Sequence, residues 1–416
     1  MSYTRPGATV SRRSVIASAA AAGLLLSGGA AAAVPARAAA GSGPVALRLP
    51  APTGPHPVGA TVLYLVDRSR KDPLTPGIPV REVMVTVFHP AASVRGRIRA
   101  RQMTPGAAAL FAEIDVHVHH LPTTGVDWAA TRTHAYADAP ALPGRRPVLL
   151  YSPGGGDPRT MGTGLAEDLA SHGYVVVAVD HPGDAGEVEF PADMPGRERV
   201  RPTVLAGPPG PDLFDLLVDT RIADLRFVLD QLAALAAGRS PDALGRPLPR
   251  GLGAALDLRR VGAYGHSLGG TAVTEALRAD RRIRAAVNLE GYLDHPPAAD
   301  GRPGELFPVA REGTDRPLLL AGTDGFRNER FERSWPAVLA RSGGRARRRL
   351  LHGAAHWVFT DYAALAPRLQ AAALMPARDR NALVGPAGPE RSVPAVRGLV
   401  RSFFGRYLPA GAAGAL

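Results

Sequence analysis

Short apolar runs and helical stripes alternate along most of this chain, and the alternation restricts its fold more than any other feature. The run at 174–179 is apolar throughout and contains four valines, which is typical of a strand buried on both faces. Residues 219–235 instead carry apolar side chains three and four positions apart, which is the spacing of one helix face. Repeated strand–helix units predict an α/β fold with a mostly parallel central sheet and helices on both faces.

The same criteria predict elements along the rest of the chain. The expected strands are 61–66, 83–88, 147–151, 174–179, 260–264, 285–289, 317–321 and 347–351. The expected helices are 165–171, 219–235, 269–277, 330–340 and 396–407. Residues 41–416 are predicted to form one domain, and 182–212, dense in proline and glycine, a loop-like insertion. That insertion is either part of a lid or substrate rim, or a plain surface loop.

Composition excludes several kinds of chemistry. The chain has no cysteine, so it has no disulfides, thiolate zinc sites, cysteine nucleophile or iron–sulfur cluster. Its net charge is +12, and Lys71 is the only lysine. The densest basic run, 345–349, has no interleaved aromatic residues, so no nucleic-acid partner is expected. The arginines are compatible with transient contact with a lipid surface, weakened by salt, and a monomer is expected.

The N-terminus resembles an export signal. Residues 11–16 read Ser-Arg-Arg-Ser-Val-Ile, a long apolar stretch follows, and small residues suited to cleavage lie at 36–40. Adjacent Arg12 and Arg13 are similar to the twin-arginine signal of bacteria. We therefore expect residues 1–40 to be removed and the mature protein to be secreted. The alternative is an uncleaved signal that anchors the protein in the membrane.

The segment Gly265-His266-Ser267-Leu268-Gly269 fits the pattern G-x-S-x-G between an apolar strand and a helix. A serine on such a strained turn needs small neighbours two residues away, so that its Oγ stands clear of the backbone. The helix N-terminus also stabilises developing negative charge. Ser267 is therefore the candidate nucleophile.

A triad on this kind of turn runs serine, acid, histidine along the chain. Of the later histidines, His356 lies in a loop just past the last strand, where a base can reach over the sheet edge. His295 comes too early, and His352 is still at the strand end. His356 is therefore the candidate base.

Two carboxylates compete for the third position. Glu290 ends the strand 285–289, and Asp324 ends the strand 317–321, so both lie where an acid could orient the imidazole. Asp294 is a more distant third. The oxyanion donors are predicted to be the backbone N–H groups of Leu268, which follows the nucleophile, and Gly155, in a glycine-rich loop after an early strand.

Together these residues resemble the platelet-activating factor acetylhydrolase family, which comprises the plasma and intracellular type II enzymes and bacterial relatives. The likeness covers most of 48–365. It is carried by Pro-Ala-Pro-Thr-Gly-Pro and Val-Gly within 50–59, by 151–155 with 169–174, by 265–289, and by 353–361, which ends His-Trp-Val-Phe-Thr-Asp. The resemblance implies an α/β-hydrolase fold. It also implies cofactor-free and metal-independent hydrolysis of short-acyl esters, including phospholipid acetyl esters such as 1-alkyl-2-acetylglycerophosphocholine.

The chain departs from the family pattern at two places. The family acid follows the strand after the elbow helix and is usually aspartate, whereas this chain has Glu290 there. We favour Glu290, with Asp324 as its rival because most other α/β-hydrolases use that location. The family also has His-Gly where this chain has Pro153-Gly154. That change is mild, because only the next backbone N–H is needed.

One further cluster, His117, His119 and His120, contains metal-ligating side chains. His117 and His119 would share one face of a strand, but no nearby third ligand is evident, so a solvated strand without metal is expected. The sequence thus predicts a secreted serine esterase acting on small-molecule or lipid esters. A lipase or polyester hydrolase on the same fold is the nearest alternative, and a non-catalytic secreted binding protein is an alternative of another class.

Overall fold

A computed structural model describes residues 43–193 and 196–411. The expected export signal at 1–40 lies outside these residues. Within the described part of the chain, no helix combines the length and the hydropathy needed to cross a bilayer.

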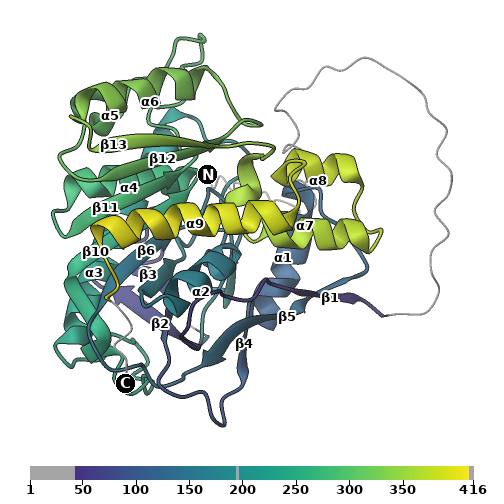
Figure 1. The fold of residues 1–416 in the computed structure, drawn as a ribbon, viewed down its shortest axis with the longest axis vertical. Helices are drawn as coiled ribbons and strands as arrows, with labels where there is room; N and C mark the ends of the chain where they lie inside the picture. Colours follow the sequence, from purple (N-terminus) through teal and green to yellow (C-terminus); the bar gives the residue numbers. More distant parts are fainter. Residues whose placement is uncertain (1–42, 194–195, 412–416) are drawn as a thin grey trace, which may run out of the picture.

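One 11-stranded sheet runs through the molecule in the order β1-β5-β2-β3-β7-β6-β10-β11-β12-β13, with β4 paired to β5 (Figure 1). Every neighbouring pair from β7 to β13 is parallel, whereas β2–β3 and β3–β7 are antiparallel. The strands of this sheet are β1 (Val45–Arg48), β2 (Val58–Asp67), β3 (Arg81–Pro90), β4 (Arg99–Arg101), β5 (Val126–Ala137), β6 (Arg146–Ser152), β7 (Val175–Val179), β10 (Leu256–His266), β11 (Ile283–Leu289), β12 (Leu318–Thr323) and β13 (Ala346–Leu351).

Helices cover both faces of the sheet. The α-helices are α1 (Pro105–Val118), α2 (Thr163–Ser171), α3 (Pro211–Ala236), α4 (Leu268–Ala279), α5 (Pro308–Glu312), α6 (Glu329–Arg341), α7 (Tyr362–Ala371), α8 (Ala377–Val384) and α9 (Pro389–Tyr407). Short 3₁₀ turns are η1 (Arg159–Gly162), η2 (Gly253–Ala255) and η3 (His356–Phe359). Apolar residues of α3, α4, α5 and α6 join one core cluster, and those of α2, α7 and α9 join another. This arrangement confirms the expected α/β-hydrolase fold.

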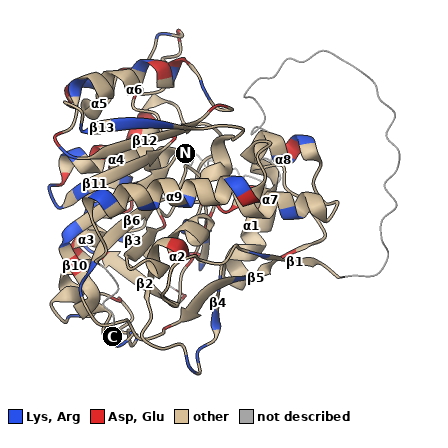
Figure 2. Ribbon diagram, in the orientation of Figure 1, with Lys and Arg blue, Asp and Glu red and all other residues tan. Residues whose placement is uncertain are grey.

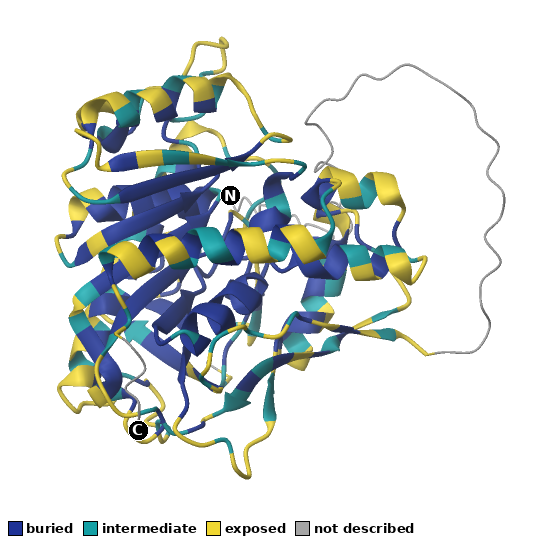
Figure 3. Ribbon diagram, viewed as in Figure 1, coloured by how far each residue is buried: buried dark blue, intermediate teal, exposed yellow. Residues whose placement is uncertain are grey.

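Strand β7 shows how the sheet joins the two clusters. All of its residues are buried, but Val175, Val177 and Val179 belong to the cluster on one face and Val176 and Ala178 to the cluster on the other. Successive strand side chains point to opposite faces, so a continuous apolar run is needed where both faces are covered. Figure 3 shows the resulting pattern, with buried strands and a helix α9 that is exposed along its outer side.

Charge is dispersed over the surface elements. Figure 2 shows basic residues on α3, α6, β13 and α9, with acidic residues among them on α6. Within β13, Arg347 is exposed and Arg348 pairs with Glu332 of α6 at 2.9 Å. The described basic residues therefore do not gather on one face in this view.

Two expectations were wrong. Residues 105–118 form helix α1, so His117 and His119 lie at the end of a helix and not on one strand face; His119 is buried, whereas His117 and His120 are exposed. The insertion 182–212 is not merely loop-like, because it holds a hairpin of β8 (Glu187–Glu189) and β9 (Val200–Pro202). Nearly all of 182–190 is buried, and this hairpin packs against α1.

Candidate active site

Ser267 lies on the turn between β10 and α4, with φ 51° and ψ −122°. This left-handed region is strained for a residue with a side chain. The turn is also tightly enclosed: a Cβ on Gly265 would lie 2.3 Å from the carbonyl oxygen of Gly269, and one on Gly269 would lie 2.0 Å from that of Ser152. The two glycines of G-x-S-x-G are therefore sterically required, and the half-buried Ser267 projects at the end of β10.

His356 begins η3, just beyond β13, and its side chain is almost fully buried. Its Nδ1 atom lies 2.9 Å from Oε2 of Glu290. The imidazole packs against Phe326, with ring centroids 4.1 Å apart, and against His266, at 4.5 Å. The ring is thus held by a carboxylate at Nδ1 and by aromatic contacts on its faces.

Glu290 follows β11 directly and is held on both carboxylate oxygens. Oε2 faces His356, and Oε1 accepts from the backbone N–H of Thr323 at 2.5 Å and from its hydroxyl at 2.8 Å. The Glu290 backbone has φ 62°, so a second strained residue lies beside the elbow. These contacts fix the carboxylate against the end of β12 and direct it at the imidazole.

The rival acid Asp324 is exposed and has a different set of partners. Its carboxylate accepts from the backbone N–H of Gly353 at 3.0 Å and of Ala354 at 3.3 Å, in the loop that carries His356. Within 43–193 and 196–411, no hydrogen bond or ion pair joins Asp324 to His356. Asp324 therefore supports the loop, whereas Glu290 contacts the imidazole.

The remaining candidates are placed elsewhere. Asp294 is buried in ion pairs with Arg330 and Arg333. His295 pairs with Asp215, and the side chain of His352 is 80% exposed. The structure therefore does not bring these side chains to the Glu290–His356 pair.

The two predicted oxyanion donors lie side by side. Leu268 is the first residue of α4, and a Cβ on Gly155 would lie 3.3 Å from Cδ2 of Leu268. In the described part of the chain, neither backbone N–H donates to another backbone group. Both are thus available to an oxygen bound next to Ser267.

Arg221 holds the loop that carries Gly155, and no pattern in the sequence indicated this role. From α3, its guanidinium donates to the carbonyl oxygens of Pro153 at 2.6 Å and Gly154 at 2.8 Å, and to Asp184 at 2.6 Å. Asp184 in turn accepts from the N–H of Gly156 at 3.0 Å. The carbonyl of Gly154 and the N–H of Gly155 belong to the same peptide. Because Arg221 binds that carbonyl, it fixes the direction in which the N–H of Gly155 points.

Burial shifts the ionisation of both members of the pair. It lowers the pKa of His356 well below its usual value, and the neighbouring His266 lowers it further. Burial also raises the pKa of Glu290 to about 8, opposed by the hydrogen bonds from Thr323. The uncharged imidazole, which can accept a proton, is therefore favoured in the resting site.

The comparisons with known proteins agree with this geometry. Residues 44–190 match the family described as platelet-activating factor acetylhydrolase, isoform II. A probable 1-alkyl-2-acetylglycerophosphocholine esterase of Arthroderma benhamiae is 31% identical over 279 residues, which cover 62% of each chain. The platelet-activating factor acetylhydrolase of Canis lupus familiaris is 25% identical over 186 residues, 40% of each chain. Over residues 44–190 the chain is therefore similar to the platelet-activating factor acetylhydrolase family.

The likeness extends to a solved structure. The ferulic acid esterase from Streptomyces cinnamoneus superposes with a TM-score of 0.67 and 31% identity, over 89% of this chain and 95% of that one. The alignment with the Arthroderma relative, in contrast, spans about three fifths of that protein's length. Glu290 stands at the position where the resemblance places the family acid.

Proposed function

We propose that the protein is a serine esterase that hydrolyses short-acyl carboxylic esters, including acetyl esters of phospholipids. The observation that carries the proposal is the 2.9 Å contact of His356 Nδ1 with Glu290 Oε2, in a site whose elbow places Ser267 at the end of β10. The family match over residues 44–190 and the names of the relatives support acetyl esters as the substrate class.

In the proposed mechanism, Nε2 of His356 takes the proton of the Ser267 hydroxyl as Oγ attacks the ester carbonyl carbon. The N–H groups of Gly155 and Leu268 stabilise the oxyanion of the tetrahedral intermediate. His356 returns the proton to the leaving alcohol, and an acyl-serine remains. Water then repeats the sequence and releases the acid, while Glu290 orients the imidazole and stabilises its protonated form.

Hydrolysis of p-nitrophenyl esters from acetate to dodecanoate, with Ser267→Ala beside the wild type, tests the proposal. We expect the hydrolysis rate of the wild type to fall steeply beyond short acyl chains. We expect the rate of Ser267→Ala to be lower than that of the wild type by about 10³-fold or more. A maximum at long chains would instead identify a lipase. Absence of serine-dependent hydrolysis, together with no labelling of Ser267 by a fluorophosphonate, would identify a binding protein.

Hydrolysis of ferulic acid esters is a second candidate. It is favoured by the ferulic acid esterase superposition and by the aromatic platform of Phe326, whose ring centroid lies 4.1 Å from that of His356. Such a platform suits an aromatic acyl group. Comparing kcat/KM for methyl ferulate with that for p-nitrophenyl acetate and for an acetyl phospholipid distinguishes the two substrates.

Export through the twin-arginine signal is part of the same proposal. Arg12 and Arg13 support it, and so do the small residues at 36–40. Expression in a bacterium with the complete chain, followed by N-terminal sequencing of the secreted form, is expected to show cleavage near residue 40. Retention of unprocessed protein in the membrane fraction would instead support an anchor.

A further inference from the structure

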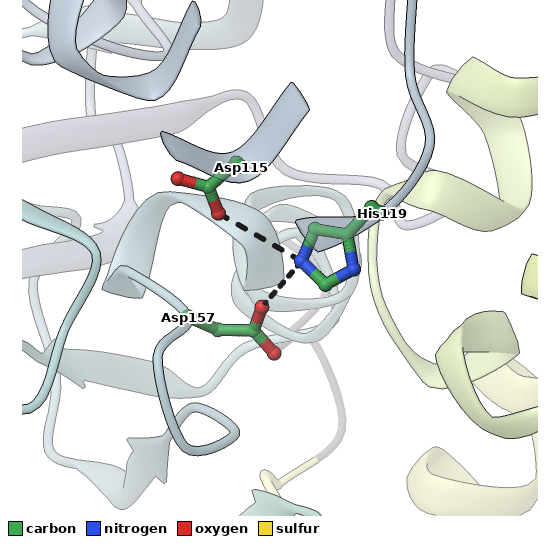
Figure 4. Close-up of side chains that lie close together, drawn as sticks. All are labelled: Asp115, His119 and Asp157. Atoms are coloured by element: carbon green, nitrogen blue, oxygen red, sulfur yellow. Dashed lines mark ion pairs between the residues drawn. The ribbon is translucent and has the colours of Figure 1, made fainter. Parts of the chain in front are cut away.

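A buried group of ionisable side chains lies behind the loop that carries Gly155. Asp115 and His119 come from the end of α1, and Asp157 comes from the loop itself (Figure 4). Their exposed fractions are 2%, 5% and 2%. Asp115 and His119 are four residues apart, so the helix brings both to one face.

The distances within this group do not match good hydrogen bonds. Nε2 of His119 lies 3.4 Å from Asp157 Oδ1 and 3.8 Å from Asp115 Oδ1, and Figure 4 shows both carboxylates directed at that one nitrogen. An N–H···O bond is usually about 2.9 Å long. Two ligands bound 2.0–2.1 Å from a tetrahedral ion lie roughly 3.4 Å apart, which is close to the observed spacing.

Unpartnered oxygens at the group point to a cation site. Oδ2 of Asp115 and both carboxylate oxygens of Glu187, itself only 2% exposed, have no hydrogen-bond partner among the described residues. Asp115 is the strongest charged neighbour of Glu187, so the two carboxyl groups face one another. A buried carboxylate without a donor is costly, and a cation between these groups would remove that cost.

The nearby arginines do not supply this charge. Arg159 pairs with Asp180, and Arg221 is engaged by Asp184 and by the carbonyl oxygens of the loop. The alternative is that Asp115 and Glu187 remain neutral and share protons. That alternative leaves the spacing of the His119 and Asp157 ligand atoms unexplained.

We propose that Asp115, His119 and Asp157 bind one divalent transition-metal ion, with Zn²⁺ the best fit, and that Glu187 supplies a fourth acidic group beside it. One imidazole nitrogen with carboxylate oxygens is a zinc-type donor set. Ca²⁺ instead favours six to eight oxygen ligands. Glu187 also lines a cavity of about 620 Å³ between β2, β3 and β5, so this fourth acidic group borders an open space.

The ion would join three segments around the Gly155 loop. Asp157 lies in that loop, α1 supplies Asp115 and His119, and Gly186, next to Glu187, donates its N–H to the carbonyl of Gly156 at 2.6 Å. Because no step of ester hydrolysis passes through this ion, its role is to position the loop. The inference therefore goes beyond the proposed activity and can fail or hold independently of it.

Metal content and thermal unfolding of the wild-type protein test the proposal directly. The protein is stripped with a chelator, incubated with Zn²⁺, Mn²⁺ or Ca²⁺ alone, and desalted. We expect about one Zn²⁺ per chain by elemental analysis and a Tm several degrees above that of the stripped protein. Wild-type protein that retains no transition metal and has the same Tm with and without added Zn²⁺ would overturn the proposal.

Matched histidine variants separate this group from surface binding. His119→Gln removes a ligand, whereas His117→Gln changes an exposed histidine at the end of the same helix. We expect the first to lose both the bound Zn²⁺ and the Zn²⁺-dependent rise in Tm, and the second to keep both. Equal zinc retention by the two variants would overturn the assignment. If His119→Gln does not fold, Glu187→Gln, which keeps the side-chain shape, takes its place in the test. It is expected to retain less Zn²⁺ than the wild type.

Discussion

Glu290 and His356 lie 66 residues apart in the chain, yet their Oε2 and Nδ1 atoms are 2.9 Å apart. The strands that present them, β11 and β13, are separated in the sheet by β12. The Glu290 side chain passes the end of β12, where Thr323 binds its other oxygen. The extra methylene of glutamate, compared with aspartate, provides reach across this strand.

Glu290→Gln and Asp324→Asn should therefore differ strongly in activity. The amide introduced by Glu290→Gln would favour the wrong imidazole tautomer and could not stabilise the protonated ring, so we expect kcat to fall about 10³–10⁴-fold. Asp324 only supports the loop through Gly353 and Ala354. We therefore expect Asp324→Asn to lower kcat roughly tenfold and to lower Tm. Steady-state kinetics on p-nitrophenyl acetate checks both. Near-normal Glu290→Gln beside an inactive Asp324→Asn would reverse the assignment.

The strain at Ser267 predicts a difference between two inactive variants. At φ 51° and ψ −122°, alanine keeps the penalty of a side chain, whereas glycine removes it. Glycine also gives the unfolded chain more freedom, which offsets part of the gain. We expect Ser267→Gly to unfold with a free energy about 1 kcal/mol higher than Ser267→Ala in urea titrations. Equal or lower stability of the glycine variant would show that the turn is unstrained.

Local patterns were sufficient to predict the elbow and the order of the main strands and helices from β6 to β13, but they missed α1, β5, α7 and α8. Gly265 and Gly269 bracket Ser267 between an apolar strand and a helix, and that combination has few alternatives. The choice between Glu290 and Asp324 could not be made from the residues, because each ends a neighbouring strand of the same sheet. Only the side-chain path past β12 separates them.

Other parts of the site had no readable signal. Arg221 lies within α3 beside its apolar stripe, and a buried arginine there has the same sequence pattern as an exposed one. Helix α1 is rich in alanine, and its end places His117 and His119 two apart, a spacing that also fits a strand. The burial of Arg221 and the helical conformation of α1 both depend on partners that are distant in the sequence, such as the loop carbonyls that Arg221 binds.

Arg221→Lys should act on catalysis through the position of Gly155. Lysine keeps the charge but cannot donate at once to Asp184 and to the carbonyls of Pro153 and Gly154. We expect kcat to fall about 10²-fold with little change in KM, because the displaced N–H acts mainly in the transition state. Arg226→Lys, an exposed arginine of the same helix, is the control and should be unchanged. A purely structural role for Arg221 would lower Tm without this change in kcat.

The acid limb of the pH–rate profile should lie below pH 6.5, the usual pKa of histidine. His356 must be uncharged to accept the serine proton, and burial, together with the charges of His266 and His119, lowers its pKa, while Asp157 opposes the shift. Activity is therefore expected to persist as pH falls through 6.5, the usual histidine value, and to decline only below it. The profile of kcat/KM between pH 4.5 and 9 measures this limb. A midpoint near 8 would instead show that ionisation of Glu290, whose pKa burial raises to about 8, controls the limb and not that of His356.

Asp361 should make the fold less stable as the pH rises. It is buried and accepts from the N–H of Gly164 at 2.9 Å, and burial raises its pKa to about 8. The unfolded chain ionises this group from about pH 4, while the folded chain keeps it protonated, so stability present at low pH is lost progressively up to pH 8.

Asp361→Asn mimics the protonated form and removes this dependence. Relative to the wild type, the variant should gain roughly 4 kcal/mol in unfolding free energy between pH 5 and pH 8, at about 1.4 kcal/mol per pH unit. Urea unfolding at pH 5, 6, 7 and 8 measures the gain, and Asp127→Asn, at an exposed aspartate, provides the matched control with a constant difference from the wild type. The difference in unfolding free energy between Asp361→Asn and the wild type should therefore widen with rising pH. If it stays constant or narrows, Asp361 is ionised in the folded protein.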